Sequence, residues 1–153
     1  MYKIKFDAKE IRVGYELPPL TRTLTQEKMD IFSAFSELEV EPSLRISGAF
    51  HTDEAYAKSK GLPGTLAQSM HYYTFVSEMM TAFFQENWLK GGKLAMAFTR
   101  MVLAGDTITC KAVISRLEEC DRGKTTVFFD VSCENQKGER VSVGTTSGLI
   151  RIE

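Results

Sequence analysis

Cysteine and histidine are scarce in this chain. Its three cysteines, Cys110, Cys120 and Cys133, contain no CxxC pair, and its two histidines, His51 and His71, belong to no cluster with metal-ligand spacing. The sequence therefore predicts free thiols rather than a disulfide or zinc framework, and it predicts no metal site. Reduced thiols are typical of the cytoplasm, so we expect a cytoplasmic protein.

Long apolar runs and net charge are also lacking. No apolar run approaches the roughly 18 residues that span a bilayer, and residues 1–6 lack the apolar core of a signal peptide. The formal net charge is −1, which gives no electrostatic reason to bind nucleic acid or an acidic membrane surface. No nucleotide, flavin or metal motif is present, and we expect no bound cofactor.

The length and composition are those of an ordinary globular protein. The chain has 153 residues, of which 43% are hydrophobic and 25% charged, enough for one well-buried core. It contains no internal repeat, low-complexity tract or linker. We therefore expect a single domain over residues 1–153.

One long apolar helix is predicted near the middle of the chain, at about 65–86. Thr65 and Gln68 match a capping box, which predicts Thr65 as the N-cap and a helical bond from the Ser69 N–H to the Thr65 carbonyl. Alternatively, the helix begins one or two residues later, which leaves the Ser69 N–H free. Phe75 and Met79 widen the apolar face, as is typical of a helix that a sheet covers. The main apolar residues recur at spacings of three and four, on one helical face; they are Leu66, Met70, Tyr73, Val76, Met80, Phe83 and Phe84.

The hydrophobic period changes from 3.6 to 2 after Gly91 and Gly92. Four alternating segments follow, at about 94–98, 108–114, 127–133 and 141–149, and glycine-containing turns join them. This pattern predicts an antiparallel meander of four strands. Gly144 and Gly148 within the last strand predict bulges or bends. The fold class is therefore α+β, with one antiparallel sheet wrapped around the central helix.

The first third of the chain predicts shorter elements: a strand at 2–6, a helix at about 26–36, and a helix at 54–58 that Thr52 or Asp53 caps. An acidic segment lies between the two helices. Its pattern favours a solvated edge or loop, and the alternative is a catalytic role for one of its carboxylates, Glu37, Glu39 or Glu41.

Five motifs lie between residues 51 and 108. They are His51-Thr52-Asp53-Glu54-Ala55-Tyr56-Ala57, Gly61-Leu62-Pro63-Gly64, Ala67-Gln68-Ser69-Met70, the segment from Gly92 to Arg100, and Val102-Leu103-Ala104-Gly105-Asp106-Thr107-Ile108. Together they resemble the motifs of the MaoC-like dehydratases, the R-specific enoyl-CoA hydratase branch of the hot-dog fold. The resemblance extends over about residues 10–152.

The resemblance implies a single hot-dog domain in which the sheet wraps the long helix. In this family two protomers pair their sheets edge to edge, and an acyl-CoA thioester lies in a tunnel at the interface. Water adds reversibly across a trans-2-enoyl thioester. An Asp and a His activate the water, and a backbone N–H at the start of the helix polarises the thioester carbonyl.

Residue by residue, the resemblance assigns His51 as the catalytic histidine and the backbone N–H of Ser69 as the oxyanion donor. The family's Asp, five residues before the histidine, is Ile46 here, and Gln68-Ser69 replaces the family's His-Gly. Glu37, or alternatively Glu39 or Glu41 of the same segment, is the candidate acid that would assist His51 in place of the Asp. Alternatively, His51 is a structural histidine that donates to a carbonyl.

The substrate-binding residues that the resemblance implies lie around the start of the helix; they are Gly64, Gln68, Met70 and Tyr72. His71 and Tyr72 would line the tunnel or, alternatively, pack in the core or at an interface. Asp53 is interpreted as a residue of a first helical turn, with a functional carboxylate as the alternative.

The sequence thus predicts an acyl-CoA hydratase or dehydratase that acts on a 2-enoyl or 3-hydroxyacyl thioester as a homodimer or higher homo-oligomer. One alternative is a non-catalytic acyl-CoA-binding subunit that pairs with a catalytic paralogue, since Ile46 replaces the Asp. Another is a hot-dog thioesterase in which a carboxylate such as Glu37 activates water. The acyl group is not encoded in any motif.

Overall fold

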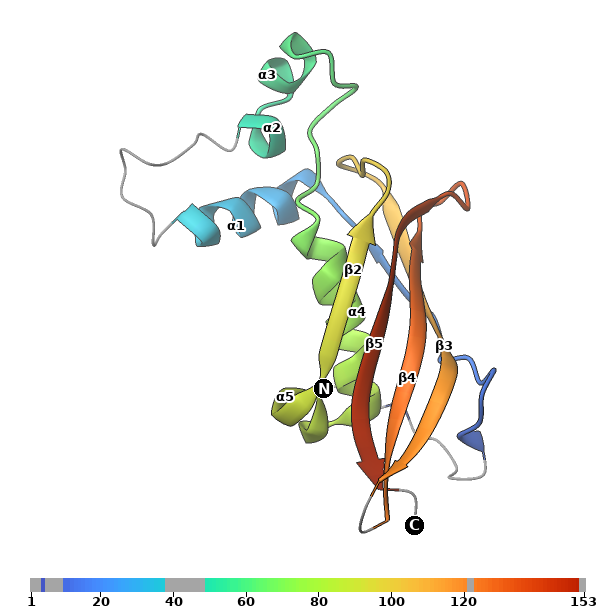
Figure 1. Ribbon diagram of the computed structural model, residues 1–153. Helices are drawn as coiled ribbons and strands as arrows, with labels where there is room; N and C mark the ends of the chain where they lie inside the picture. Colours follow the sequence, from blue (N-terminus) through green and yellow to red (C-terminus); the bar gives the residue numbers. More distant parts are fainter. Residues whose placement is uncertain (1–3, 5–9, 38–48, 121–122, 152–153) are drawn as a thin grey trace.

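The structure is a computed structural model that describes residues 4, 10–37, 49–120 and 123–151. Its strands form one antiparallel sheet with the order β1-β3-β4-β5-β2 (Figure 1). The strands are β1 (Leu20–Thr23), β2 (Lys93–Phe98), β3 (Thr107–Cys120), β4 (Lys124–Glu134) and β5 (Arg140–Arg151). The α+β fold class and the four C-terminal strands are confirmed.

The order of the strands differs from a simple meander. Only β3, β4 and β5 follow one another in the sheet, whereas β2 pairs with β5, from Lys93 opposite Ser147 to Phe98 opposite Ser142. The short strand β1, which the sequence did not indicate, pairs with β3. Helices α1 to α5 come between β1 and β2 in the chain, and these two strands occupy opposite edges of the sheet.

The helices are α1 (Gln26–Glu37), α2 (Ala49–Thr52), α3 (Glu54–Ser59), α4 (Met70–Phe84) and α5 (Glu86–Gly91). The predicted helix at about 26–36 is confirmed as α1, and the one at 54–58 as α3, whose N-cap is Asp53. Helix α4 lies along the sheet, while α1, α2 and α3 gather at one end of it (Figure 1). No described helix is long and apolar enough to cross a membrane.

The predicted start of the long helix at Thr65 is wrong. Residues 65–67 are extended, because their backbone groups pair with other segments: the Leu66 N–H donates to the Phe50 carbonyl, and the Ala67 N–H donates to the Val102 carbonyl. Thr65 is buried, and its hydroxyl donates to the Gln26 side-chain oxygen instead of capping a helix. The helix begins five residues later, at Met70, with Ser69 as its N-cap.

The core lies between α4 and the sheet. Phe83 and Phe84 near the end of α4 make edge-to-face contacts with Phe129 of β4, at ring-centroid distances of 5.1 and 5.9 Å. All three rings are almost fully buried. Cys110 and Cys133, opposite each other on β3 and β4, are buried free thiols within this core. Of the predicted strand at 2–6, only Ile4 is described; it is not in a strand, and the other residues lie outside the described ones.

Gly144 and Gly148 do not produce bulges, since the β4–β5 register runs unbroken past both residues. They allow close approach instead. A Cβ at Gly144 would lie 2.1 Å from the Ala95 carbonyl oxygen of β2, and a Cβ at Gly148 would lie 2.8 Å from the Phe84 ring. Glycine at these positions lets β2 and α4 pack against β5.

We expect Gly144→Ala to destabilise the protein by about 1–3 kcal/mol, because the Ala95 backbone that its methyl group meets can move only with β2. Urea unfolding measures the change. Gly91→Ala is the matched control, since a Cβ at Gly91 meets nothing within 4 Å. Equal stability of the Gly144→Ala variant and the wild type would show that β2 shifts away freely.

Candidate active site

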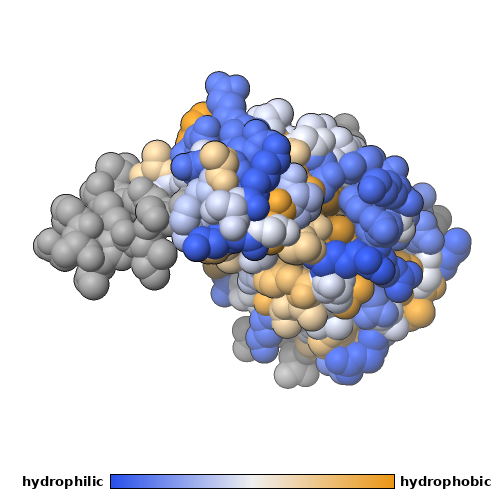
Figure 2. Space-filling view, turned by 90° about the horizontal axis from the view of Figure 1, so that it is seen from above, coloured by the Kyte–Doolittle hydropathy of each residue, from blue (hydrophilic) through white to orange (hydrophobic). Residues whose placement is uncertain are grey.

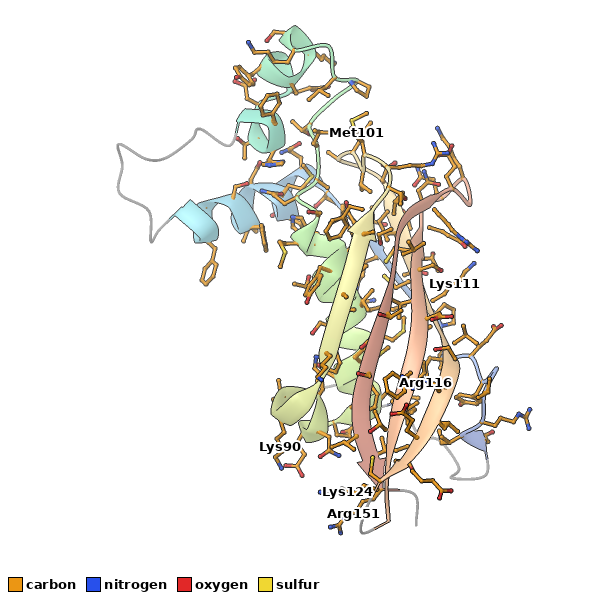
Figure 3. The ribbon with its side chains drawn as sticks, viewed as in Figure 1. Lys90, Met101, Lys111, Arg116, Lys124 and Arg151 are labelled. Atoms are coloured by element: carbon orange, nitrogen blue, oxygen red, sulfur yellow. The ribbon has the colours of Figure 1, made fainter. Side chains whose placement is uncertain are left out.

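The predicted site residues meet where α2, the start of α4 and the segment before β3 come together. A pocket of about 280 Å³ lies there. Met101 borders it from the loop between β2 and β3 and is labelled in Figure 3. The pocket's lining residues are His51, Leu66, Ala67, Gln68, Ser69, Met70, Tyr72, Met101 and Val102. Of the sequence-predicted binding residues, Gln68, Met70 and Tyr72 line this pocket and Gly64 does not.

The His51 ring is fixed by the extended segment before α4. Its Nδ1 lies 2.6 Å from the Leu66 carbonyl oxygen. A carbonyl oxygen only accepts hydrogen bonds, so Nδ1 carries the hydrogen and, in the neutral ring, Nε2 has the free lone pair. The His51 backbone is also held, because the Gln26 amide donates to the His51 carbonyl at 2.7 Å. This arrangement provides a positioned proton acceptor.

Among the described residues, Gln26 links His51 to the carboxylate of Asp30. The Gln26 Nε2 that bonds to the His51 carbonyl also donates to Asp30 Oδ1 at 2.8 Å. Over the described part of the chain, no carboxylate hydrogen-bonds to the His51 ring itself. Glu37 is the last residue of α1 and its side chain is not described, so its role stays a prediction. Glu39, Glu41 and Ile46 lie outside the described residues.

The start of α4 presents backbone N–H groups to the same pocket. The Tyr73 N–H bonds to the Ser69 carbonyl and the His71 N–H to the Gln68 carbonyl, but among the described residues nothing accepts from the N–H of Ser69 or Met70. Since the helix begins at Met70 rather than at Thr65, the Ser69 N–H makes no helical bond to the Thr65 carbonyl, which accepts from the Ala104 N–H instead. These N–H groups and the helix dipole favour a negative charge here.

Side chains around the helix start are packed under α1. Gln68 donates through Nε2 to the Ser33 hydroxyl at 2.5 Å, and the buried His71 ring lies against Phe32. Burial lowers the pKa of His71, and the nearby charges of His51 and Lys28 lower it further. The His71 ring is therefore neutral near pH 7. Where the structure is described, neither Gln68 Oε1 nor His71 Nε2 has a hydrogen-bond partner.

Asp53 caps α3, since its Oδ1 accepts from the Tyr56 N–H at 2.9 Å. This agrees with a helix-capping role rather than a catalytic one. Sequence reasoning missed Gln26 and Met101. Gln26 was predicted only as a helix residue, and its contacts with residues 51 and 65 are too distant in sequence to leave a signal. Within the described ranges, no group of three or more His, Cys, Asp or Glu side chains is arranged to hold a metal.

Tyr72 is the most deeply buried ionisable side chain of the pocket, 3% exposed, with its ring edge-on to Phe98. Burial raises the pKa of Tyr72 to about 12, from 10.0. The folded state thus holds the phenolic proton more tightly than the unfolded chain does. The resulting contribution to stability is intact below pH 10 and is lost as the pH rises to about 12.

We therefore expect the wild type to lose up to about 2–3 kcal/mol more free energy of unfolding than Tyr72→Phe between pH 9 and pH 12. Denaturant unfolding of both proteins at the two pH values measures the difference, and groups common to both cancel. An equal loss of unfolding free energy in the two proteins would contradict the burial of an ionisable phenol at this position.

Apolar surface is exposed around the pocket. Met70, Phe98 and Met101 are 47, 43 and 61% exposed, although all three are large apolar side chains. Figure 2 views the molecule from this end and shows apolar surface beside hydrophilic surface. Phe98 ends the edge strand β2, so this apolar surface continues to a free edge of the sheet.

The fold and the site together define a hot-dog protein with a histidine and the first N–H groups of a helix in one pocket. The family model described as MaoC-like domain matches residues 49–136. The chain therefore belongs to the MaoC-like domain family.

Solved structures agree with this fold. An (R)-hydratase from A. caviae involved in PHA biosynthesis is 18% identical with a TM-score of 0.70, over 95% of this chain and 99% of that one. The R-hydratase PhaJ1 from Pseudomonas aeruginosa is 19% identical with a TM-score of 0.70, over 96 and 86%. A chain of the ChsH1–ChsH2 complex from Mycobacterium tuberculosis is 14% identical with a TM-score of 0.71, over 92 and 99%. No curated protein matches the chain.

Proposed function

We propose that this protein is a hydratase that adds water reversibly to a 2-enoyl thioester of CoA. The observation that supports this most is the position of His51. Its Nδ1–H is held by the Leu66 carbonyl, which leaves Nε2 to accept a proton, and the Ser69 N–H, which has no acceptor among the described residues, borders the same pocket. A proton acceptor and an oxyanion donor are two of the groups that this reaction uses.

In the proposed reaction His51 Nε2 takes a proton from water, and the hydroxide oxygen bonds to C3 of the enoyl group. The electrons of the double bond shift toward the thioester carbonyl, whose oxygen becomes negative and accepts from the Ser69 N–H. The proton then passes from His51 to C2, which gives the 3-hydroxyacyl thioester. Dehydration is the same sequence in reverse. Gln68, Met70 and Tyr72 would contact the acyl group or the thioester.

We further propose that residues 1–153 form one domain that acts as a homodimer, paired through the β2 edge. Strand β2 ends the sheet, and an unpaired edge is a ready site for pairing with another strand. The exposed apolar side chains of Met70, Phe98 and Met101 lie next to this edge or on it, where a second copy would cover them.

The test is to incubate the purified protein with crotonyl-CoA and with longer 2-enoyl-CoAs and to follow the loss of enoyl absorbance. We expect turnover with at least one chain length. No turnover with any of them would overturn the proposal. Release of free CoA from a saturated acyl-CoA would instead indicate thioester hydrolysis, because a saturated chain has no double bond to hydrate.

A second candidate is a non-catalytic subunit that binds acyl-CoA and relies on a paralogue for catalysis. Ile46 in place of the Asp favours it, as does the lack of any described carboxylate on the His51 ring. Co-purification from the native host distinguishes the two. Recovery as an active homodimer would exclude this candidate, whereas an inactive protein that gains activity with a co-purified paralogue would support it.

A further inference from the structure

A basic pocket lies at the opposite end of α4 from His51. It has a volume of about 490 Å³ and is formed by α5 together with the first residue of β4 and the last residues of β5. Its described lining contains three cationic side chains, Lys90, Lys124 and Arg151, and one acidic side chain, Glu86. Figure 3 shows the three cations at the same end of the molecule. The lining therefore has an excess of positive charge.

Two of these cations are directly opposed. Lys124 and Arg151 are cross-strand partners in the β4–β5 register. Like charges in this position destabilise a sheet. Neither side chain forms a hydrogen bond or an ion pair with any described residue. By contrast, Lys111 of β3 faces the same strand β4 and is paired with Glu134 at 2.5 Å.

Lys90 adds a third charge from α5. Its partner Glu86 lies 3.0 Å away, and both side chains are largely exposed, at 66 and 75%. An ion pair this exposed contributes little, so the Lys90 ammonium can turn toward a ligand at little cost. Repulsion between Lys124 and Arg151 would be relieved by an anion with several oxygens, and phosphate esters suit Arg and Lys together.

The position of the pocket relates it to the proposed substrate. Helix α4 has 15 residues, so the two pockets are separated by about 22 Å along the helix. A dimer with twofold symmetry pairs identical edges antiparallel. Pairing through β2 therefore places the basic pocket of one protomer beside the His51 pocket of its partner.

We propose that Lys90, Lys124 and Arg151 bind the phosphate groups of the CoA thioester whose acyl end lies in the His51 pocket of the partner protomer. This inference rests on the proposed function for the identity of the ligand. Phosphates at the basic pocket would orient the thioester before reaction and add uniform binding, which lowers KM and leaves kcat unchanged.

The first test needs no turnover. Calorimetric titration with free CoA, dephospho-CoA and inorganic phosphate is compared between wild type and Arg151→Glu/Lys124→Glu, with Lys58→Glu on α3 as the control. We expect CoA affinity to fall at least tenfold in the double variant only, and to depend strongly on salt. Unchanged CoA affinity would overturn the proposal. If the wild type bound inorganic phosphate but not CoA, and the double variant lost the phosphate binding, the assignment of the ligand as CoA would be wrong.

The second test uses the activity. In the double variant we expect a KM at least tenfold higher for an enoyl-CoA, with kcat retained, and an unchanged KM for the matching enoyl-pantetheine, which has no nucleotide phosphates. Mixed dimers that pair one protomer of the double variant with one protomer of His51→Ala test the arrangement across the interface. One of their two sites combines an intact His51 with an intact basic pocket of the partner, so wild-type KM should return. A KM that stays high would contradict binding across the dimer.

Discussion

Replacement of His51 by alanine is expected to lower kcat for enoyl-CoA hydration by about 10²–10⁴-fold, the usual contribution of a positioned general base. Alanine removes the proton acceptor and leaves the Ser69 N–H in place. The substrate should still bind, so KM should change little. Initial rates over a range of enoyl-CoA concentrations, at fixed protein concentration, separate the two parameters.

Two variants make this result specific. His51→Gln has an amide that can still donate to the Leu66 carbonyl but has no basic nitrogen, so it should be as inactive as His51→Ala. Lys58→Ala, on the exposed surface of α3, should keep wild-type activity. Circular dichroism and thermal unfolding establish that all three fold. If either His51 variant retained more than a tenth of the wild-type kcat, His51 would not be the base.

The sequence predicted the elements whose apolar pattern is local. Helix α4 and strands β2 to β5 each show a repeated spacing within one segment. The packing of α4 against the sheet matches that pattern from Val76 to Phe84, whereas Met70 at the helix start is exposed. The start of α4 was wrong because residues 65–67 pair with Phe50, Val102 and Ala104, which are distant in sequence. A capping box takes account only of hydrogen bonds between nearby residues, whereas residues 65–67 bond to partners that are distant in sequence.

The predicted order of the strands was wrong for a similar reason. The alternation of apolar residues shows that β2 is a strand but does not show which strand it pairs with. Gly144 indicates the pairing with β5, but this is visible only in the structure. That glycine accommodates the Ala95 carbonyl of β2. From sequence, Gly144 was interpreted as a bulge or a bend, because a glycine in a strand is as typical of these as of close backbone approach.

The site residues were predicted from the motifs of the family resemblance more than from hydrophobic patterns. His51, Gln68, Ser69, Met70 and Tyr72 line one pocket, and the resemblance had grouped them at one end of the long helix. A hydrogen bond from His51 to a carbonyl was one of the two interpretations of this residue, but the acceptor was not predictable, since the Leu66 carbonyl is available only because residues 65–67 are extended. The incorrect helix start and the unpredicted hydrogen bond between His51 and Leu66 therefore have a single cause.

Phe129→Ala is expected to cause the largest loss of stability, about 3–5 kcal/mol. Phe129 is 0% exposed and its ring meets Phe83 and Phe84 edge-to-face, so it joins the centre of the sheet to the end of α4. Alanine would leave a cavity that two other large rings cannot fill without leaving their rotamers. The midpoint of thermal unfolding should fall by roughly 6–20 °C.

Phe35→Ala is the matched control for this prediction, because it deletes the same atoms from a ring on α1 that is 76% exposed. Its effect should stay within about 0.5 kcal/mol. Both variants are compared with the wild type by urea unfolding at one protomer concentration, since dimerisation stabilises the folded state by mass action. A Phe35→Ala loss as large as that of Phe129→Ala would mean that a partner covers the exposed face of α1, and that stability depends on the dimer as much as on the core around Phe129.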